Sequence, residues 1–189
     1  MLEYKDKIID ISERLLKSCT VEMVIGFRKG TLPMMNEPCF AKTPTEVQQF
    51  LWDSNCGINL ANYITNRKEK IGIVAKGCDT RNIVTHIIEN KINRDQLVII
   101  GVPCKGMIDK RKITSMFEDE ITQVDEKGGN VLVTAGGKTT ALDKQEVLQQ
   151  NCSVCTHRNP VIYDELVADL VEEQTDVDRY ADVDYASDR

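Results

Sequence analysis

Apolar residues near the start of the chain recur about every 3.6 residues. Over 2–18 they include Ile8, Ile11 and Leu15, and this period predicts an amphipathic helix. The apolar run at 21–25 that follows has the character of a β-strand. The glycines and prolines within 26–40 then predict a loop, so the chain is expected to open as helix, strand and loop.

The pattern becomes helical again after this loop. Thr43 or Thr45 can cap a helix that starts at Glu46 and runs to Trp52, because a threonine hydroxyl can accept from the first free backbone N–H groups. A further short helical stretch is expected between residues 56 and 63.

The middle of the chain carries the clearest pattern. Residues 71–75 and 97–100 are short, continuous apolar runs, typical of buried strands, and 80–90 between them has one apolar helical face. The residues 76–79 are expected to form a turn with Asp79 as the helix N-cap. Strand, helix and strand within about 30 residues predict a βαβ unit with parallel strands and a right-handed crossover.

The second half of the chain predicts a small antiparallel structure and further helices. A β-hairpin is expected around Gly128-Gly129, because two strand-like segments flank this turn. The expected elements are helical or irregular structure at 110–117, strands at 121–126, 130–135 and 138–142, a helix at 144–150 capped by Asp143, and a C-terminal helix at 161–171. The predicted fold class is therefore α/β, a βαβ core of parallel strands flanked by helices, with a small antiparallel hairpin.

Composition fits one globular unit with an acidic end. We expect residues 1–171 to form a single α/β domain and 172–189 to form a flexible acidic tail. The tail holds seven acidic residues against two arginines, a net charge of −5 out of −6 for the whole chain. The nearly neutral body has no basic surface for a phosphate backbone, so a nucleic acid partner is not expected.

The chain shows no feature of a membrane or exported protein. No stretch approaches the roughly 20 apolar residues of a membrane span, and the mixed charges at the N-terminus do not resemble a signal peptide. We therefore expect no membrane insertion and a cytoplasmic location. In that compartment seven cysteines indicate metal or redox chemistry rather than disulfides.

Four of these cysteines form a plausible ligand set. Cys78 and Cys104 follow the two predicted parallel strands, whose carboxyl ends lie at the same rim of a sheet. Cys152 and Cys155 form a C-x-x-C pair. Four thiolates are the number that an iron-sulfur cluster or a structural zinc ion requires.

The roles of the other cysteines and the chemistry of the C-x-x-C pair stay open. Cys39 and Cys56 lie beside proline or glycine and could replace one of the four ligands or add to them, whereas Cys19 is expected in the core. The C-x-x-C pair could also be a redox dithiol, although it does not directly follow a strand. A zinc site would need a second ligand pair, and a histidine such as His157 is more often a capping or surface residue than a ligand.

Basic residues surround the cysteine segments. Lys76, Arg81 and Lys105 could hold a flavin phosphate or a partner's carboxylates, with Gly77 leaving room, or could simply be solvated. Ordinary nucleotide motifs are missing: the Gly136-Gly137 segment lies between strands and reads as a turn, and no G-x-G-x-x-G follows the first strand of the βαβ unit.

The cysteine segments together resemble a known family. Residues 76–83 (KGCDTRNI), 100–104 (IGVPC) and 152–156 (CSVCT), in this order and spacing, are similar to the beta subunits of hydrogenases and dehydrogenases that use the deazaflavin coenzyme F420, which include formate dehydrogenase beta chains. The similarity covers roughly residues 70–168.

The resemblance implies an α/β subunit that carries a 4Fe-4S cluster and exchanges electrons with a flavin. Cys78, Cys104, Cys152 and Cys155 would be the ligands. FAD would bind this chain or a partner, and the partner would be a hydrogenase, dehydrogenase or flavoprotein subunit. Because family members are longer, electron relay is expected rather than catalysis by this chain alone. The alternatives are a zinc-stabilised protein-interaction module without a redox role and a flavin enzyme in its own right.

Overall fold

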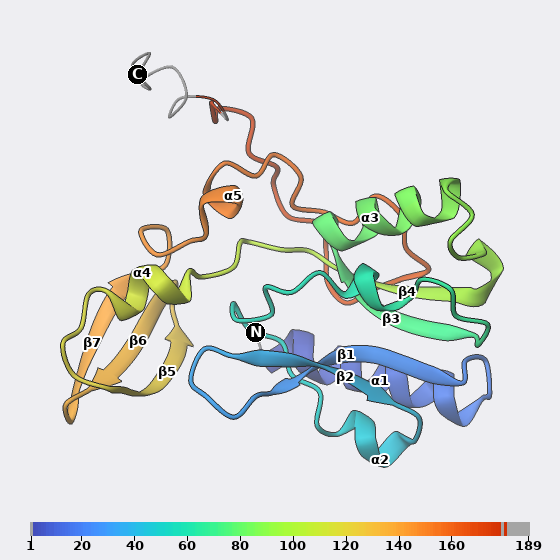
Figure 1. Ribbon diagram of the computed structural model, residues 1–189, viewed down its shortest axis with the longest axis horizontal. Coiled ribbons are helices and arrows are strands. Elements are labelled where there is room, and N and C mark those ends of the chain that lie inside the picture. The colour runs from blue at the N-terminus through green and yellow to red at the C-terminus, as the bar shows by residue number, and fades with distance from the viewer. Residues whose placement is uncertain (1, 179, 181–189) are drawn as a thin grey trace.

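The computed structural model describes residues 2–178 and Tyr180, and it contains two β-sheets joined through loops (Figure 1). The larger sheet has the strand order β2-β1-β3-β4-β8 and the smaller one the order β5-β6-β7. The strands are β1 (Met23–Lys29), β2 (Asn36–Ala41), β3 (Ile71–Lys76), β4 (Leu97–Val102), β5 (Ile121–Lys127), β6 (Asn130–Ala135), β7 (Lys138–Asp143) and β8 (Glu165–Leu166).

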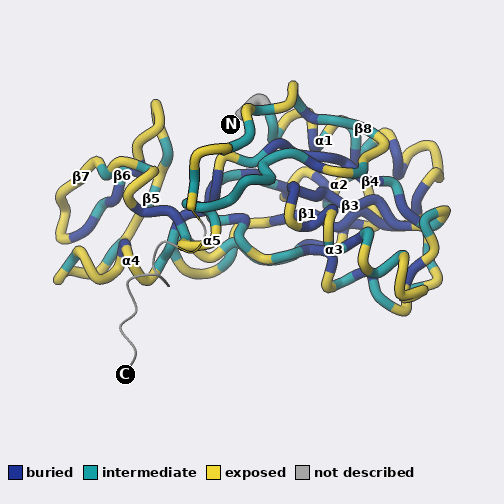
Figure 2. The backbone as a smooth tube through the Cα atoms, turned by 90° about the horizontal axis from the view of Figure 1, so that it is seen from above, coloured by how far each residue is buried: buried dark blue, intermediate teal, exposed yellow. Residues whose placement is uncertain are grey.

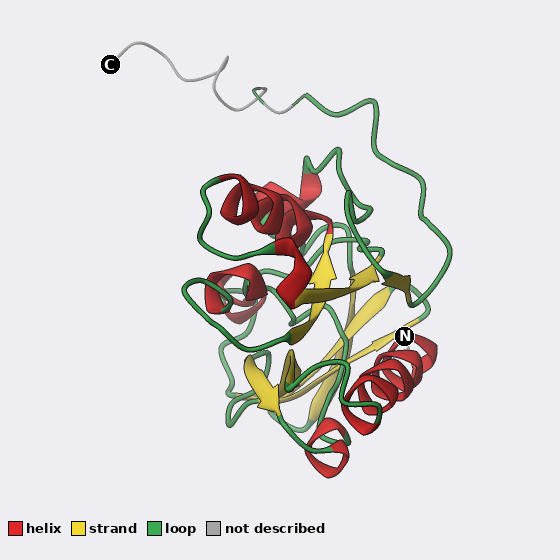
Figure 3. Ribbon diagram, turned by 90° about the vertical axis from the view of Figure 1, so that its right-hand side faces the viewer, coloured by secondary structure: helices red, strands yellow, loops and turns green. Residues whose placement is uncertain are grey.

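Helices cover both faces of the larger sheet. The amphipathic helix α1 packs across β1, β3 and β4, and α3 packs against β3 and β4. Figure 3 shows the sheet as a layer between them, with the N-terminal helix on one side. The helices are α1 (Leu2–Lys17), α2 (Pro44–Val47), α3 (Gly77–Ile88), α4 (Lys110–Thr114) and α5 (Gln150–Ser153), with 3₁₀ turns at Leu60–Tyr63 and Arg94–Gln96. The predicted α/β class is confirmed.

The predicted βαβ unit with parallel strands is confirmed. Strands β3 and β4 pair in parallel, from Ile71 opposite Leu97 to Lys76 opposite Val102, and α3 connects them. All six residues of β3 are buried, which explains why the strand reads as a continuous apolar run rather than an alternating one. Buried backbone is concentrated in these central strands (Figure 2).

The smaller sheet also matches the prediction. Strands β5 and β6 form the expected hairpin, and β7 adds the third antiparallel strand. Its buried side chains belong to a second apolar cluster, separate from the main core: Ile108, Ile113, Val131, Val133 and Val147. The structure thus has two apolar clusters. The expectation that 1–171 forms a single domain stays a prediction.

The loop predicted at 26–40 is confined to residues 30–35, and its two ends belong to strands. Strand β1 continues to Lys29 and turns back into β2, which is an edge strand. Pro38 is tolerated there because an edge strand has N–H groups that face no neighbour. Gly26 is needed inside β1, since a Cβ at this position would lie 2.9 Å from the ring of Phe50.

The predicted C-terminal helix at 161–171 is wrong. The segment consists of bends and irregular backbone around the short strand β8, which pairs in parallel with the outer edge of β4. Asp164 completes this edge: its N–H donates to the Ile99 carbonyl at 2.9 Å, and its carboxylate accepts from the Ile99 N–H at 2.7 Å. Unpaired groups of β4 thus override the local helical pattern, because buried backbone groups need partners.

Three helix boundaries differ from prediction. Helix α3 begins at Gly77, whereas the sequence predicted a start after Asp79. Asp79 is instead the third residue of the helix, and its carboxylate accepts a hydrogen bond from the Lys76 N–H. The helix predicted at 144–150 is replaced by turns and by α5, which contains Cys152. Helix α2 is capped by Thr43 as expected, but it begins with Pro44 and ends at Val47.

Two further expectations concern the chain as a whole. Within the described residues, no helix combines the length and apolar character needed to cross a bilayer. The predicted acidic tail at 172–189 is described only for residues 172–178 and Tyr180, and the remainder lies outside the described residues.

Candidate functional site

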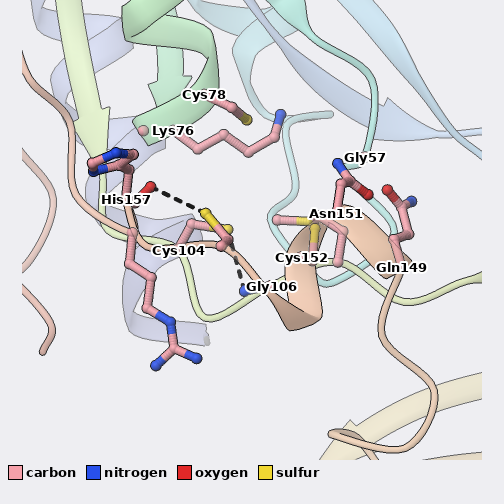
Figure 4. Close-up of a pocket in the computed structure, with 13 residues that line it drawn as sticks. Gly57, Lys76, Cys78, Cys104, Gly106, Gln149, Asn151, Cys152 and His157 are labelled. Carbon is pink, nitrogen blue, oxygen red and sulfur yellow. Dashed lines mark hydrogen bonds between the residues drawn. The ribbon is translucent and has the colours of Figure 1, made fainter. Parts of the chain in front are cut away.

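The four cysteines of the predicted ligand set line one cavity. Cys78, Cys104, Cys152 and Cys155 are among its lining residues, and its volume is about 110 Å³. Figure 4 shows three of them, Cys78, Cys104 and Cys152, reaching the cavity from different segments. Tertiary structure therefore gathers thiols that are up to 77 positions apart in the sequence.

The sheet explains half of this convergence. Cys78 is the second residue of α3, directly after β3, and Cys104 comes two residues after the end of β4. Because β3 and β4 are parallel neighbours, both residues lie at the carboxyl rim, where connecting loops of such sheets form binding sites. The other two cysteines come from α5 and the loop that follows it.

Glycines allow these segments to approach one another. A Cβ on Gly77 would lie 2.6 Å from the carbonyl oxygen of His157 and 2.8 Å from that of Asn159, so the start of α3 touches the loop after the C-x-x-C pair. Gly106 has a φ of +99°, and a Cβ there would also meet Leu148 at 2.8 Å.

A buried cation lies beside the thiols. Lys76 is 2% exposed, and its ammonium donates to both carboxylate oxygens of Asp79, at 3.0 and 3.1 Å, and to the carbonyl of Ile58 at 2.8 Å. Burial alone would lower the pKa of Lys76, but the Asp79 carboxylate raises it above the ordinary lysine value. The ammonium therefore stays charged at the cavity wall, where it is paired with Asp79.

Burial raises the pKa of three of the cavity thiols, those of Cys78, Cys104 and Cys152. Burial, followed by the Asp79 carboxylate, raises the pKa of Cys78 to about 12, although one side of the residue is open to solvent. Burial also raises the pKa of Cys104 and of Cys152. The Cys104 sulfur accepts a hydrogen bond from the Gly106 N–H at 3.4 Å, and the Cys152 sulfur accepts one from the Met107 backbone. Both hydrogen bonds act against the increase in the thiol pKa.

As the side chains stand, they do not form a ready-made coordination group. Within the described part of the chain, no three histidine, cysteine, aspartate or glutamate side chains are placed to hold a metal ion. Two thiols point instead to protein acceptors, Cys155 to the carbonyl of His157 at 3.4 Å and Cys78 to the carboxylate of Asp79 at 3.9 Å.

The donor set nevertheless suits a thiolate-bound metal by its chemistry. Four thiols share one cavity, backbone N–H groups face two of the sulfurs, and the Lys76 ammonium, paired with Asp79, lies at the cavity wall. Thiolate ligands and such N–H groups are what iron-sulfur sites use. Ligation would remove the thiol protons and with them the present hydrogen bonds of Cys78 and Cys155.

The remaining cysteines do not line this cavity. Cys39 is buried in β2, and Cys56 is fully buried beside Asp53 and Asn36, where burial raises its pKa to about 12. Cys19 is exposed, so its expected place in the core is wrong. Cys19 follows the end of α1 with a φ of 53°, the left-handed conformation common just after a helix.

The predicted cofactor residues divide into two groups. Lys76 and Gly77 line the cavity, whereas Lys105 is exposed and lines a neighbouring hollow with Trp52, and Arg81 is exposed on α3. Arg158 also lines the cysteine cavity and was not singled out from the sequence. The sequence feature that could have identified Arg158 is its position three residues after the C-x-x-C pair.

The fold and cavity define an α/β protein with a cysteine-lined cavity at the carboxyl ends of parallel strands. No family model matches the chain. Among solved structures it is similar to a chain of the F420-reducing [NiFe] hydrogenase complex from Methanosarcina barkeri, with a TM-score of 0.62 and 13% identity. The match covers 81% of this chain but only 59% of the hydrogenase chain.

At this identity the likeness establishes a shared fold. The subunit family that the cysteine segments resemble stays a prediction.

Proposed function

We propose that the protein is an iron-sulfur electron-transfer subunit of a larger oxidoreductase. The observation that carries this proposal is the convergence of Cys78, Cys104, Cys152 and Cys155 on one cavity from three parts of the chain. Small buried cysteines explain single positions equally well, but they do not explain why four of them share one cavity.

The residues around the cavity have complementary roles. A 4Fe-4S cluster bound there would supply one-electron transfer. The four cysteines would hold it as thiolates, and the N–H groups of Gly106 and Met107 would donate to the sulfurs. Lys76, paired with Asp79, would place its ammonium close to the thiolates.

The fold supports a place within a redox complex. A chain of similar fold belongs to a hydrogenase complex, and this chain spans 59% of its length. We infer a hydrogenase, dehydrogenase or flavoprotein subunit as partner, in the cytoplasm and without nucleic acid. FAD would be held by the partner or by this chain, where Lys76, Gly77, Arg81 and Lys105 remain the proposed contacts.

Metal analysis of protein prepared without oxygen tests the proposal. After reconstitution with iron and sulfide, we expect about four irons per chain, broad visible absorbance and an EPR signal on reduction. Zinc at one per chain, with no bound iron and full stability in air, would instead establish the zinc-stabilised module. A yellow cofactor in the pure protein would support a flavin enzyme.

Single cysteine variants test the ligand set. Cys78→Ser, Cys104→Ser, Cys152→Ser and Cys155→Ser should each lose iron and the EPR signal, because a serine hydroxyl replaces a thiolate ligand. Cys19→Ser is the matched control, since Cys19 is exposed and does not line the cavity. An unchanged iron content in all four variants would exclude this cavity as the cluster site.

A further inference from the structure

The segment after β8 returns to the loop that carries the C-x-x-C pair. Figure 1 shows the two chain segments running side by side near α5. The carboxylate of Glu173 accepts hydrogen bonds from the backbone N–H of Arg158, from the backbone N–H of Asn159 at 3.2 Å, and from the Asn159 side-chain amide at 2.8 Å. One carboxylate thus binds three donors of the loop.

Two neighbouring residues extend the contact. The side chain of Asn159 donates to the carbonyl of Val171 at 2.7 Å and accepts from its N–H at 2.9 Å. Gln174 donates to the carbonyls of Ser153 at 3.3 Å and Cys155 at 3.0 Å. The loop is therefore held at both ends.

The loop has little regular structure of its own. Beyond α5, residues 154–159 form turns and bends without strand pairing, yet Cys155, His157 and Arg158 line the cysteine cavity. A further backbone bond, from the Cys104 N–H to the Arg158 carbonyl at 2.9 Å, ties the loop to the rim of the larger sheet. Backbone groups left unpaired in such a loop must find partners elsewhere, and residues 171–174 provide them.

We propose that residues 171–174 form a clasp that holds residues 154–159, the cysteine loop, in position. Glu173 is the central positioning residue of this clasp. The role of the clasp toward a metal rests on the function proposed above, whereas its role toward the loop rests on these contacts alone. Glu173 lies in the segment that the sequence predicts as a flexible acidic tail, and it acts here as a structural anchor.

Thiol alkylation of the full-length, reduced, metal-free protein tests the clasp directly. In Glu173→Gln the side chain keeps one acceptor oxygen and turns an amide toward donors, so Cys155 should react with iodoacetamide several-fold faster, as followed by mass spectrometry. Glu172→Gln is the matched control, because Glu172 is the exposed neighbour. The exposed Cys19 should react at an unchanged rate, and the buried Cys56 should remain protected.

Equal Cys155 reactivity in Glu173→Gln, Glu172→Gln and the unchanged protein would overturn the clasp. If Glu173→Gln unfolds, which labelling of Cys56 would reveal, Gln174→Ala replaces it, since this variant removes only the two bonds to the Ser153 and Cys155 carbonyls. Faster Cys155 labelling in Gln174→Ala, with Cys56 still protected, supports the clasp, and an unchanged rate rejects it.

Iron retention separates this inference from the proposed function. In reconstituted protein, a chelator should remove iron several-fold faster from Glu173→Gln than from Glu172→Gln, and the EPR line shape should change. If the unchanged protein binds no iron, the proposed function fails while the labelling result still decides whether the clasp exists. If iron binds and its release is equal in both variants, the clasp has no role in metal binding.

Discussion

The side chain of Lys76 places a buried ammonium group at the cysteine cavity. Lys76 has three acceptor contacts from Asp79 and Ile58, and its ammonium also lies 5.4 Å from the centre of the Phe27 ring. A charge in this position is tolerated only because it is paired, since an isolated buried ion costs several kcal/mol. The sequence shows Lys76 beside a cysteine but does not show that it points inward.

Replacing Lys76 should therefore destabilise the protein strongly. Lys76→Met keeps a similar length and leaves the Asp79 carboxylate buried without its partner, which should lower the free energy of unfolding by roughly 3–5 kcal/mol. Urea denaturation of the metal-free protein measures this loss. Lys105→Met, at an exposed position, should change it by less than about 0.5 kcal/mol. Similar losses in both variants would contradict the paired arrangement.

Glu173 should titrate below its ordinary range. Burial alone would raise the pKa of Glu173, but hydrogen bonds from Arg158 and Asn159, with a smaller effect of His157, lower it below the usual 4.5. The contribution of Glu173 to stability is thus present above its unfolded pKa and lost as the pH falls through the lowered folded value.

NMR can follow this titration at the loop. The amide signal of Arg158 should move with a midpoint below 4.5, since its N–H donates to the carboxylate. Glu173→Gln should lack that transition and Glu172→Gln should keep it. A midpoint at or above 4.5 would show that the hydrogen bonds do not favour the charged form.

At the scale of elements, α3 joins the sheet to the site through its first turn. The βαβ pattern predicted this helix because its strands and apolar face are local features of the sequence. The three residues by which it starts earlier depend on Asp79 accepting from the Lys76 N–H, and on the space that Gly77 leaves for the loop at 157–159.

Gly77→Ala tests that contact. The added methyl group would meet two backbone carbonyl oxygens, of His157 and Asn159, which cannot move aside as a flexible side chain can. We expect a loss of about 1–3 kcal/mol in the free energy of unfolding, measured with urea, together with faster alkylation of Cys155. Thr85→Ala, on the exposed side of the same helix, is the control. Stability equal to that of the control would mean that the loop lies elsewhere.

At the scale of the whole molecule, one carboxylate of the small sheet binds the loop that contains Ser54. Glu126, near the end of β5, accepts from the N–H of Ser54 at 2.7 Å and from its hydroxyl at 2.8 Å, and it pairs with Lys144 at 3.2 Å. Ser54 also accepts, through its carbonyl, from the Ile108 N–H at 3.0 Å. This network connects the small sheet to the segment that runs from Cys104 into the second apolar cluster.

Glu126→Ala should loosen the small sheet. It removes two bonds to Ser54 and leaves Lys144 without its pair, at a cost of about 2–3 kcal/mol. Hydrogen exchange should accelerate in β5–β7 more than in β3. Asp125→Ala, at the exposed adjacent position, provides the control. Uniform acceleration across both sheets would show that they unfold as a single unit.

The sequence by itself determined the elements whose signals are local. The apolar runs of β3 and β4, the periodic face of α1 and the hairpin of β5 and β6 all follow from side-chain spacing, and so does the expectation that Cys78 and Cys104 share a rim.

Only the tertiary structure decided the remaining features. It made Pro38 part of an edge strand, turned the helical pattern at 161–171 into β8, and placed Cys152 and Cys155 opposite the sheet rim. It also brought Glu173 onto the cysteine loop. The physical reason is that these features depend on hydrogen bonds between backbone groups of distant segments. The spacing of residues along the chain does not show which distant segments will pair.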